Sequence, residues 1–314
     1  MPREVPPGSA ALEFGLQVGL PRDEPLILEV KDRLGRSFQG RIEIQTRTFI
    51  TIERDVGIKM VLVPAGTFIM GTSGHRRPKS EHPAHEVYLD EYYIDLHEVT
   101  VGEFKRVMGK TNWWPQVQFN PYPYEFCNKD DRLPVAGVTW NDVQVYVRFY
   151  HKKGIPLRLP TEAEWEKAAR GMQEWKYPWG NEFDPEAANW NIGGQRSTKA
   201  KDWVKYLMPV GSFPRGKSPY GCLDMVGNVE EWCADWYDKN YYQHSPLRNP
   251  EGPPEGTLRV VRGGSWASTR RSDLTVTARR GRGPENPWNT VGFRCCVSAK
   301  DLPRDVLRSL QRRR

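Results

Sequence analysis

Twelve tryptophans are spread through a chain of 314 residues that also holds 28 glycines and 26 prolines. Glycine and proline disfavour long helices, whereas large aromatic side chains can anchor irregular segments by burying much apolar area. A chain of this length buries about three quarters of the surface that it exposes when unfolded, so disulfides are not required for stability. The mixture predicts a loop-rich fold whose irregular segments are held by tryptophans.

The net charge, the apolar runs and the cysteines limit the compartments in which we expect this chain. The net charge of +7 favours solubility and acidic partners. The longest apolar runs, such as 60–63, are far shorter than the roughly 20 residues of a membrane span, and the polar N-terminus does not resemble a signal peptide. The five cysteines form no CxxC pair, which argues against a disulfide framework and a four-thiolate zinc site. We therefore expect a cytoplasmic protein with reduced thiols and no membrane contact.

Local patterns divide the chain into three parts. Residues 26–32 and 40–52 alternate apolar and polar side chains around a turn at 33–36, which predicts an antiparallel β-hairpin. A buried strand, a turn and a second strand at 60–71 begin a main domain. The expected parts are an N-terminal extension with the hairpin (1–55), a main domain (56–299) and a basic C-terminal tail (300–314).

One capping signal predicts three helices. In a capping box, a threonine side chain accepts from the amide three residues later, and an acid at that later position reaches back to the threonine. The three boxes begin at Thr100, Thr139 and Thr161. A glycine favours a left-handed helix end, and the glycines expected to end these helices are Gly109, Gly154 and Gly171. The two longer helical patterns cover 140–153 and 162–170.

Eight segments support a family resemblance. They are 60–71, 87–100, 134–140, 158–166, 177–181, 221–236, 262–266 and 292–295. In content and order they resemble the formylglycine-generating enzyme, or sulfatase-modifying factor, family over about 58–297. The resemblance implies a C-type-lectin-like fold of the α+β class, with a small twisted antiparallel sheet, two main helices and a long irregular excursion.

The resemblance also bears on catalysis. Oxidase members of the family hold a copper ion on two cysteines shortly after the Arg-Gly-Gly-Ser motif, where soft thiolates suit Cu(I). Those two positions are Ser268 and Asp273 here, and neither side chain supplies a thiolate. We therefore expect neither copper binding nor formylglycine formation, and we interpret the chain as a non-catalytic binding module.

Two structural calcium sites are implied by the same resemblance. Calcium prefers carboxylate, amide and carbonyl oxygens. The first site corresponds to the side chains of Asp224 and Glu231 and the carbonyls of Gly227 and Val229. The second corresponds to the side chains of Asn189 and Asp202 and the carbonyls of Trp190 and Val204. We expect calcium at both sites, with a structural role.

The C-terminal segment 259–294 carries eight arginines. In lectin-fold proteins this segment contacts partners, and arginine and tryptophan dominate binding hot spots. The residues expected to bind a protein or small-molecule ligand here are Trp266, Ser268, Arg270, Arg280, Arg282, Asn286, Trp288 and Thr290. Nucleic-acid platforms use similar residues, but we disfavour a nucleic-acid partner because Arg262 and Arg294 belong to structural motifs.

Two alternatives stay open. One branch of the family, the variable proteins of diversity-generating retroelements, places its hypervariable ligand-binding residues in this same C-terminal segment. The other alternative is a divergent metal-dependent oxidase or sulfatase-modifying-type enzyme. Its metal ligands would come from His75, His82 and His85, with Glu81 and Glu86 nearby. A structural loop is the plainer interpretation of this histidine cluster.

Overall fold

The computed structural model describes residues 26–31, 37–42, 49–53, 57–75, 77–109, 130–199 and 203–302. The chain divides into two compact units, residues 1–44 and 45–314. In the first unit, β1 (Leu26–Lys31) pairs antiparallel with β2 (Ser37–Ile42) to form a hairpin.

The next strand belongs to the second unit. β3 (Phe49–Glu53) pairs antiparallel with β4 (Gly57–Val63). The prediction that 40–52 forms one arm of the N-terminal hairpin is therefore wrong for its second half. The two units separate between residues 44 and 45, ahead of the boundary expected after residue 55. Alternation along a chain predicts a strand, but it does not identify the strand's partner.

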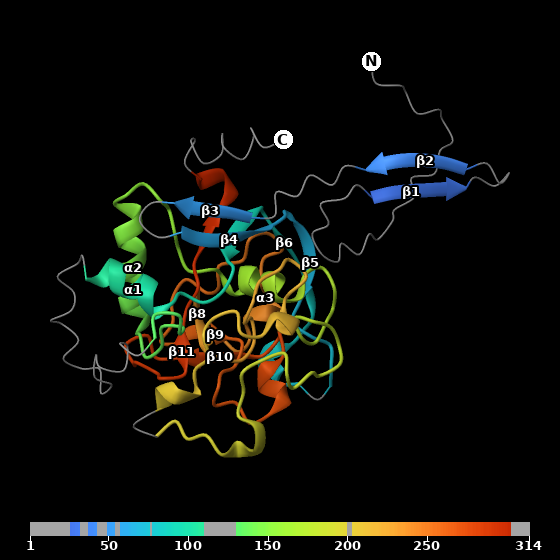
Figure 1. Ribbon diagram of the computed structural model, residues 1–314. Coiled ribbons are helices and arrows are strands. Elements are labelled where there is room, and N and C mark those ends of the chain that lie inside the picture. Colours follow the sequence, from blue (N-terminus) through green and yellow to red (C-terminus); the bar gives the residue numbers. More distant parts are fainter. Residues whose placement is uncertain are drawn as a thin grey trace. The chain divides into compact units, whose positions relative to one another are not determined.

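Among the described residues, the second unit holds two four-stranded sheets and one pair of strands (Figure 1). The first sheet has the order β12–β7–β4–β3 and is antiparallel, with β7 at Tyr92–Asp95 and β12 at Cys296–Ser298. The isolated pair is β5 (Gly66–Met70) with β6 (His85–Leu89).

The second sheet positions the C-terminal segment. Its order is β10–β9–β8–β11, in which β11 runs parallel to β8 and the other neighbours are antiparallel. The bounds of these strands are Glu230–Trp236 for β8, Arg259–Arg262 for β9, Arg279–Arg282 for β10 and Val291–Gly292 for β11. The sheet therefore joins the 224–231 loop directly to the arginine-rich C-terminal segment 259–294.

All three predicted helices are present, each with both hydrogen bonds of its capping box. They are α1 (Val101–Met108), α2 (Trp140–His151) and α3 (Glu162–Arg170). Gly171 ends α3 with a positive φ of 69°, which favours glycine, but its ψ of −149° differs from that of a left-handed helical cap. The left-handed end predicted at Gly109 is wrong, because its φ is −64° and its amide continues the helical pattern by donating to Lys105. Gly154 is left-handed, but α2 ends earlier.

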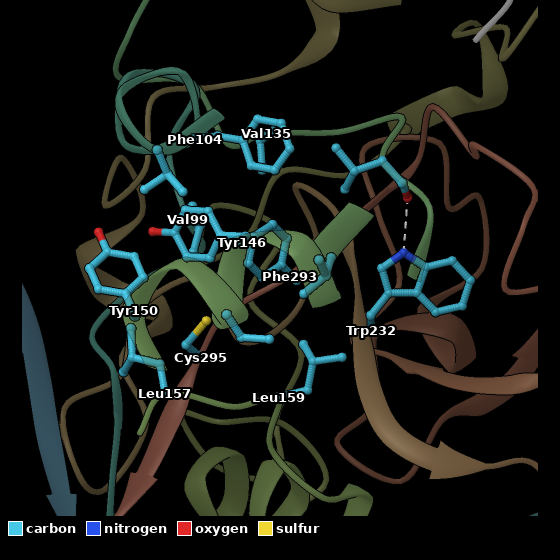
Figure 2. Packing of buried hydrophobic residues seen from close by; sticks show 14 of the residues in the cluster. Val99, Phe104, Val135, Tyr146, Tyr150, Leu157, Leu159, Trp232, Phe293 and Cys295 are labelled. Atoms are coloured by element: carbon cyan, nitrogen blue, oxygen red, sulfur yellow. Dashed lines mark hydrogen bonds between the residues drawn. The ribbon is translucent and has the colours of Figure 1, made fainter. Parts of the chain in front are cut away.

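Buried aromatic side chains organise the main core. Figure 2 shows Phe104 of α1, Tyr146 of α2 and Phe293 packed together. The Tyr146 and Phe293 rings meet edge-on with centroids 5.3 Å apart. Trp232 of β8 is fully buried, and its indole N–H donates to the Val138 carbonyl at 3.0 Å. Trp232 thus connects a strand to an irregular segment, which is the anchoring role that the composition predicts.

Two arginines of the family motifs are also interior. Arg262 is 1 % exposed and pairs with Glu162 and Glu166 of α3. Arg294 is 0 % exposed and pairs with Glu231. Their burial is consistent with a structural role, so they do not contribute to an exposed basic surface. No helix in the described part of the chain is long and apolar enough to cross a membrane.

Candidate ligand-binding face and calcium loops

Five of the predicted ligand residues are not buried, and we call them the arginine–tryptophan face: Arg270, Arg280, Arg282, Asn286 and Trp288. Arg280 and Arg282 are two residues apart on β10, so they share one side of the strand. The Arg280 side chain is 45 % exposed and Trp288 is 37 % exposed. The Arg282 guanidinium carbon lies 4.3 Å from the centre of the Trp288 ring, a cation–π contact that orients both groups.

A buried carboxylate holds these arginines from beneath. Glu230, the first residue of β8, is 3 % exposed. Its Oε2 accepts from Arg282 Nη2 at 2.9 Å, and its Oε1 lies 3.5 Å from Arg280 Nη1. The other end of the Arg280 guanidinium pairs with Asp273 at 2.7 Å. Two carboxylates therefore balance Arg280 and Arg282, so these two residues offer oriented planar groups and little unbalanced positive charge.

Three residues predicted to contact ligand lie inside the protein instead. Trp266 is 0 % exposed and stacks against the rings of Trp203 and Tyr206. Ser268 and Thr290 are also buried. The expectation that these three side chains are exposed is wrong. A fold this rich in loops uses such side chains to fill its interior and to make hydrogen bonds there.

The positions that carry the copper ligands in oxidase members have other partners here. Ser268 Oγ accepts from the Ser265 amide at 3.0 Å, and Asp273 pairs with Arg280. The four cysteines in the described part of the chain are buried, free thiols. Burial raises the pKa of Cys222 to about 11, and it also raises the pKa of Cys233, Cys295 and Cys296. These thiols are therefore protonated at neutral pH.

The histidine cluster does not come together as a metal centre. Within the described residues, no three or more His, Cys, Asp or Glu side chains are grouped to hold a metal ion. Glu81 instead pairs with Arg77 at 2.7 Å through both of its oxygens and accepts from Thr277. These contacts tie the histidine-bearing loop to the C-terminal segment, which agrees with the structural interpretation of the loop.

The loop expected to form the first calcium site is tightly turned. Asp224, Gly227 and Asn228 all have positive φ angles, and the Asp224 carboxylate accepts from the Gly211 amide. Glu231, however, is 0 % exposed and bound by other groups. Both of its oxygens accept from Arg294 at 2.7 Å, and Oε2 also accepts from the Trp165 indole. The charge of Glu231 is therefore already balanced within the protein.

A second acid, which the sequence analysis did not select, faces this loop. Glu98 is 0 % exposed, and its Oε1 accepts from Asn228 Nδ2 at 3.1 Å. Among the described residues, its Oε2 has no hydrogen-bond partner. Burial, followed by the charge of Asp224, raises the pKa of Glu98, and burial raises the pKa of Asp224. Glu98 precedes the first capping box by two residues, and only its position inside a buried, family-like segment could have drawn attention to it.

The residues expected at the second calcium site are mostly interior. Asn189, Trp190 and Val204 are 3 %, 9 % and 5 % exposed. Asp202 lies outside the described residues. The Asn189 side-chain amide donates to the Tyr206 carbonyl at 2.8 Å and to Asn228 Oδ1 at 3.1 Å. Asn189 therefore links this loop to the first calcium loop.

Comparison with known proteins identifies the family that has this architecture. The profile of the Sulfatase-modifying factor enzyme 1-like domain matches residues 47–299. The chain belongs to this family. The family assignment and the mixed fold with small antiparallel sheets agree with the predictions made from the sequence.

The names of the proteins similar to this family member state different activities. It is 31 % identical to the inactive C-alpha-formylglycine-generating enzyme 2 of Mus musculus, over 76 % of this chain and 86 % of that protein. It is 30 % identical to the formylglycine-generating enzyme of Bos taurus, over 78 % and 75 %. A serine/threonine-protein kinase pkn1 of Chlamydia caviae is 34 % identical over 77 % of this chain. This chain spans only 38 % of the length of that kinase.

Solved structures agree with the fold. PvdO from Pseudomonas aeruginosa superposes with a TM-score of 0.63 at 27 % identity, covering 79 % of this chain and 97 % of PvdO. Treponema denticola variable protein 1 superposes with a TM-score of 0.61, covering 80 % of this chain and 98 % of that one. At 23 % identity, the second likeness shows the fold alone.

Proposed function

We propose that this family member is a non-catalytic module that binds a protein or small-molecule ligand at the arginine–tryptophan face. The observation that carries the proposal is the exposed pair of Arg280 and Trp288, oriented by buried Glu230 through Arg280 and through the Arg282 contact with Trp288. Side chains that are already fixed lose less conformational entropy on binding, which makes them effective anchors. The hydroxyl and carboxylate at the two copper positions support a non-catalytic role.

Affinity capture from native lysate tests this proposal. Trp288→Ala and Arg280→Ala remove exposed groups, so we expect each to lose partner capture while the Tm stays nearly unchanged. Arg215→Ala serves as the matched control, because Arg215 is another partly exposed arginine, with a side chain 64 % exposed and paired to acids. Capture that is equally strong in all three variants would contradict the proposed face.

The competing proposal is a divergent metal-dependent enzyme. It is favoured by the 30 % identity to the bovine enzyme, which lies between the 29 % and 31 % identities to two relatives named inactive. If this alternative holds, protein purified under anaerobic conditions contains one equivalent of a redox metal. Protein that lacks such a metal and still captures a defined partner would favour the binding module.

For the first calcium loop, we propose that Asp224 and Glu98 supply the acidic ligands, with carbonyls of Gly227 and Val229. Glu98 Oε2 has no hydrogen-bond partner in the described part of the chain, and the two buried carboxylates fit a cation with hard oxygen preference, which would neutralise both charges. Glu231 stays paired with Arg294 in this arrangement.

Calcium would stabilise the folded state by mass action, since the site is absent from the unfolded chain. We expect calcium to raise the Tm of the wild type above its value in chelator. The response should disappear in Glu98→Gln and Asp224→Asn and persist in the surface control Asp130→Asn. A wild-type Tm that does not respond to calcium would reject this site.

We also propose a cytoplasmic location. The four cysteines of the described residues are free thiols, which suits a reducing compartment. Cell fractionation tests this, with recovery in the cytoplasmic fraction expected and recovery in a secreted fraction contradicting it.

A further inference from the structure

One arginine stands where the resemblance implies a second calcium ion. Arg196 lies in the loop after Trp190, and its Nη1 donates to Asn189 Oδ1 at 2.7 Å. This oxygen is the one that Asn189 would offer to calcium, because the nitrogen of the same amide already donates to Tyr206 and Asn228. The guanidinium also lies over the Tyr206 ring, 5.7 Å from its centre.

The chain holds this arginine in place through its backbone. The side chain of Asn191, 2 % exposed, accepts from the Arg196 amide at 3.0 Å and donates to the Arg196 carbonyl at 2.9 Å. Gly193 and Gly194 between them have φ angles of 77° and 72°, so they can close the loop that returns Arg196 to Asn189. The loop is therefore built to present the guanidinium at this position.

The other described donors of the implied site are engaged as well. The Trp190 carbonyl accepts from the Ile192 amide at 3.1 Å, and the Val204 carbonyl accepts from the Leu207 amide at 3.1 Å. Calcium takes six to eight oxygens at about 2.3–2.6 Å, and a guanidinium at hydrogen-bond distance from a ligand oxygen would repel it. The described donors, Asn189, Trp190 and Val204, therefore do not fit calcium at the second site.

We propose that the Arg196 guanidinium replaces the second calcium ion in this chain as a built-in cation. No carboxylate among the described side chains forms an ion pair with Arg196, and its described hydrogen bonds go to an amide oxygen and a carbonyl oxygen. Its Nη1 also reaches the Trp266 carbonyl at 3.4 Å, and the Asn191 amide donates to the Ser268 carbonyl at 2.9 Å. Arg196 thus links Asn189 to the Trp266 carbonyl without needing calcium.

Titration with calcium alone, followed by calorimetry, tests the proposal. In Asp224→Asn, which removes the first proposed site, we expect no calcium binding. One remaining equivalent that disappears on adding Asn189→Ala would overturn the proposal. If the wild type binds no calcium either, the first site fails while the Arg196 proposal stands, so the two failures are distinguishable.

Thermal melts in chelator test whether the Arg196 guanidinium stabilises the folded state. We expect Arg196→Ala to lower the Tm by several degrees and Arg196→Gln, which keeps a donor without the charge, to lower it less. Lys199→Ala removes an exposed cation three residues further along the loop and should leave the Tm unchanged. A Tm of Arg196→Ala equal to that of the wild type would overturn the proposal.

Discussion

The buried ion pair of Glu231 and Arg294 permits a sharp test of how this fold is held together. The two side chains are 1 % and 0 % exposed, and two hydrogen bonds of 2.7 Å join them. Glu231→Gln keeps the shape and one acceptor oxygen but removes the charge. Because breaking a buried pair leaves an uncompensated charge, we expect the free energy of unfolding to fall by about 3–5 kcal/mol.

Urea unfolding in the presence of chelator measures this loss without a contribution from calcium. A unit of this size shifts its Tm by roughly 2–4 °C per kcal/mol, so a thermal melt should show a decrease of about 10 °C. The control Arg215→Ala removes an arginine whose pairs are exposed, and it should cost about 0–1 kcal/mol.

A double variant separates the charge from the packing. Replacing both Glu231 and Arg294 with Met removes the uncompensated charge, so we expect much of the lost stability to return. A loss below about 1 kcal/mol for Glu231→Gln alone would refute the reasoning. It would mean that Arg294 is satisfied by the carbonyls of Asp95, Leu96 and Leu223, which it also contacts.

Two further predictions concern α3. Lys167 donates to the carbonyls of Pro64 and Gly66, and burial lowers its pKa from 10.5 to about 8. Between these values the unfolded chain binds more protons, so the contribution of Lys167 to stability rises with pH. The free energy of unfolding of the wild type relative to that of Lys167→Met, measured with urea, should therefore be larger at pH 10 than at pH 7. A smaller difference at pH 10 would contradict the assignment. Thr161→Ala removes the cap of α3 and should cost about 1 kcal/mol, whereas Thr161→Ser should retain most of it.

The local elements were predictable from the sequence because their signals are local. Each capping box lies within four residues, and the structure contains all three with both hydrogen bonds. Gly109 shows the limit of such signals, since a glycine permits a left-handed helix end but does not require it. The family, and with it the fold, followed from the order of eight segments.

The candidate site was predictable only in part. Arg280, Arg282 and Trp288 were selected by residue type, and the structure does bring Arg282 and Trp288 into contact. Trp266 was selected by the same rule and is buried, because a tryptophan suits an interface and a core equally well. Residue type predicts what a side chain can do, while its exposure depends on packing.

The sequence by itself determined the family, the three helix starts and the absence of thiolates at the copper positions, because each depends on residues close together in the chain or on residue identity. Only the tertiary structure decided which charges meet. Glu98 faces the Asp224 loop, Glu231 pairs with Arg294, and Arg196 reaches Asn189. Such pairings depend on distances in space between oxygens and cations, and a single sequence records none of those distances.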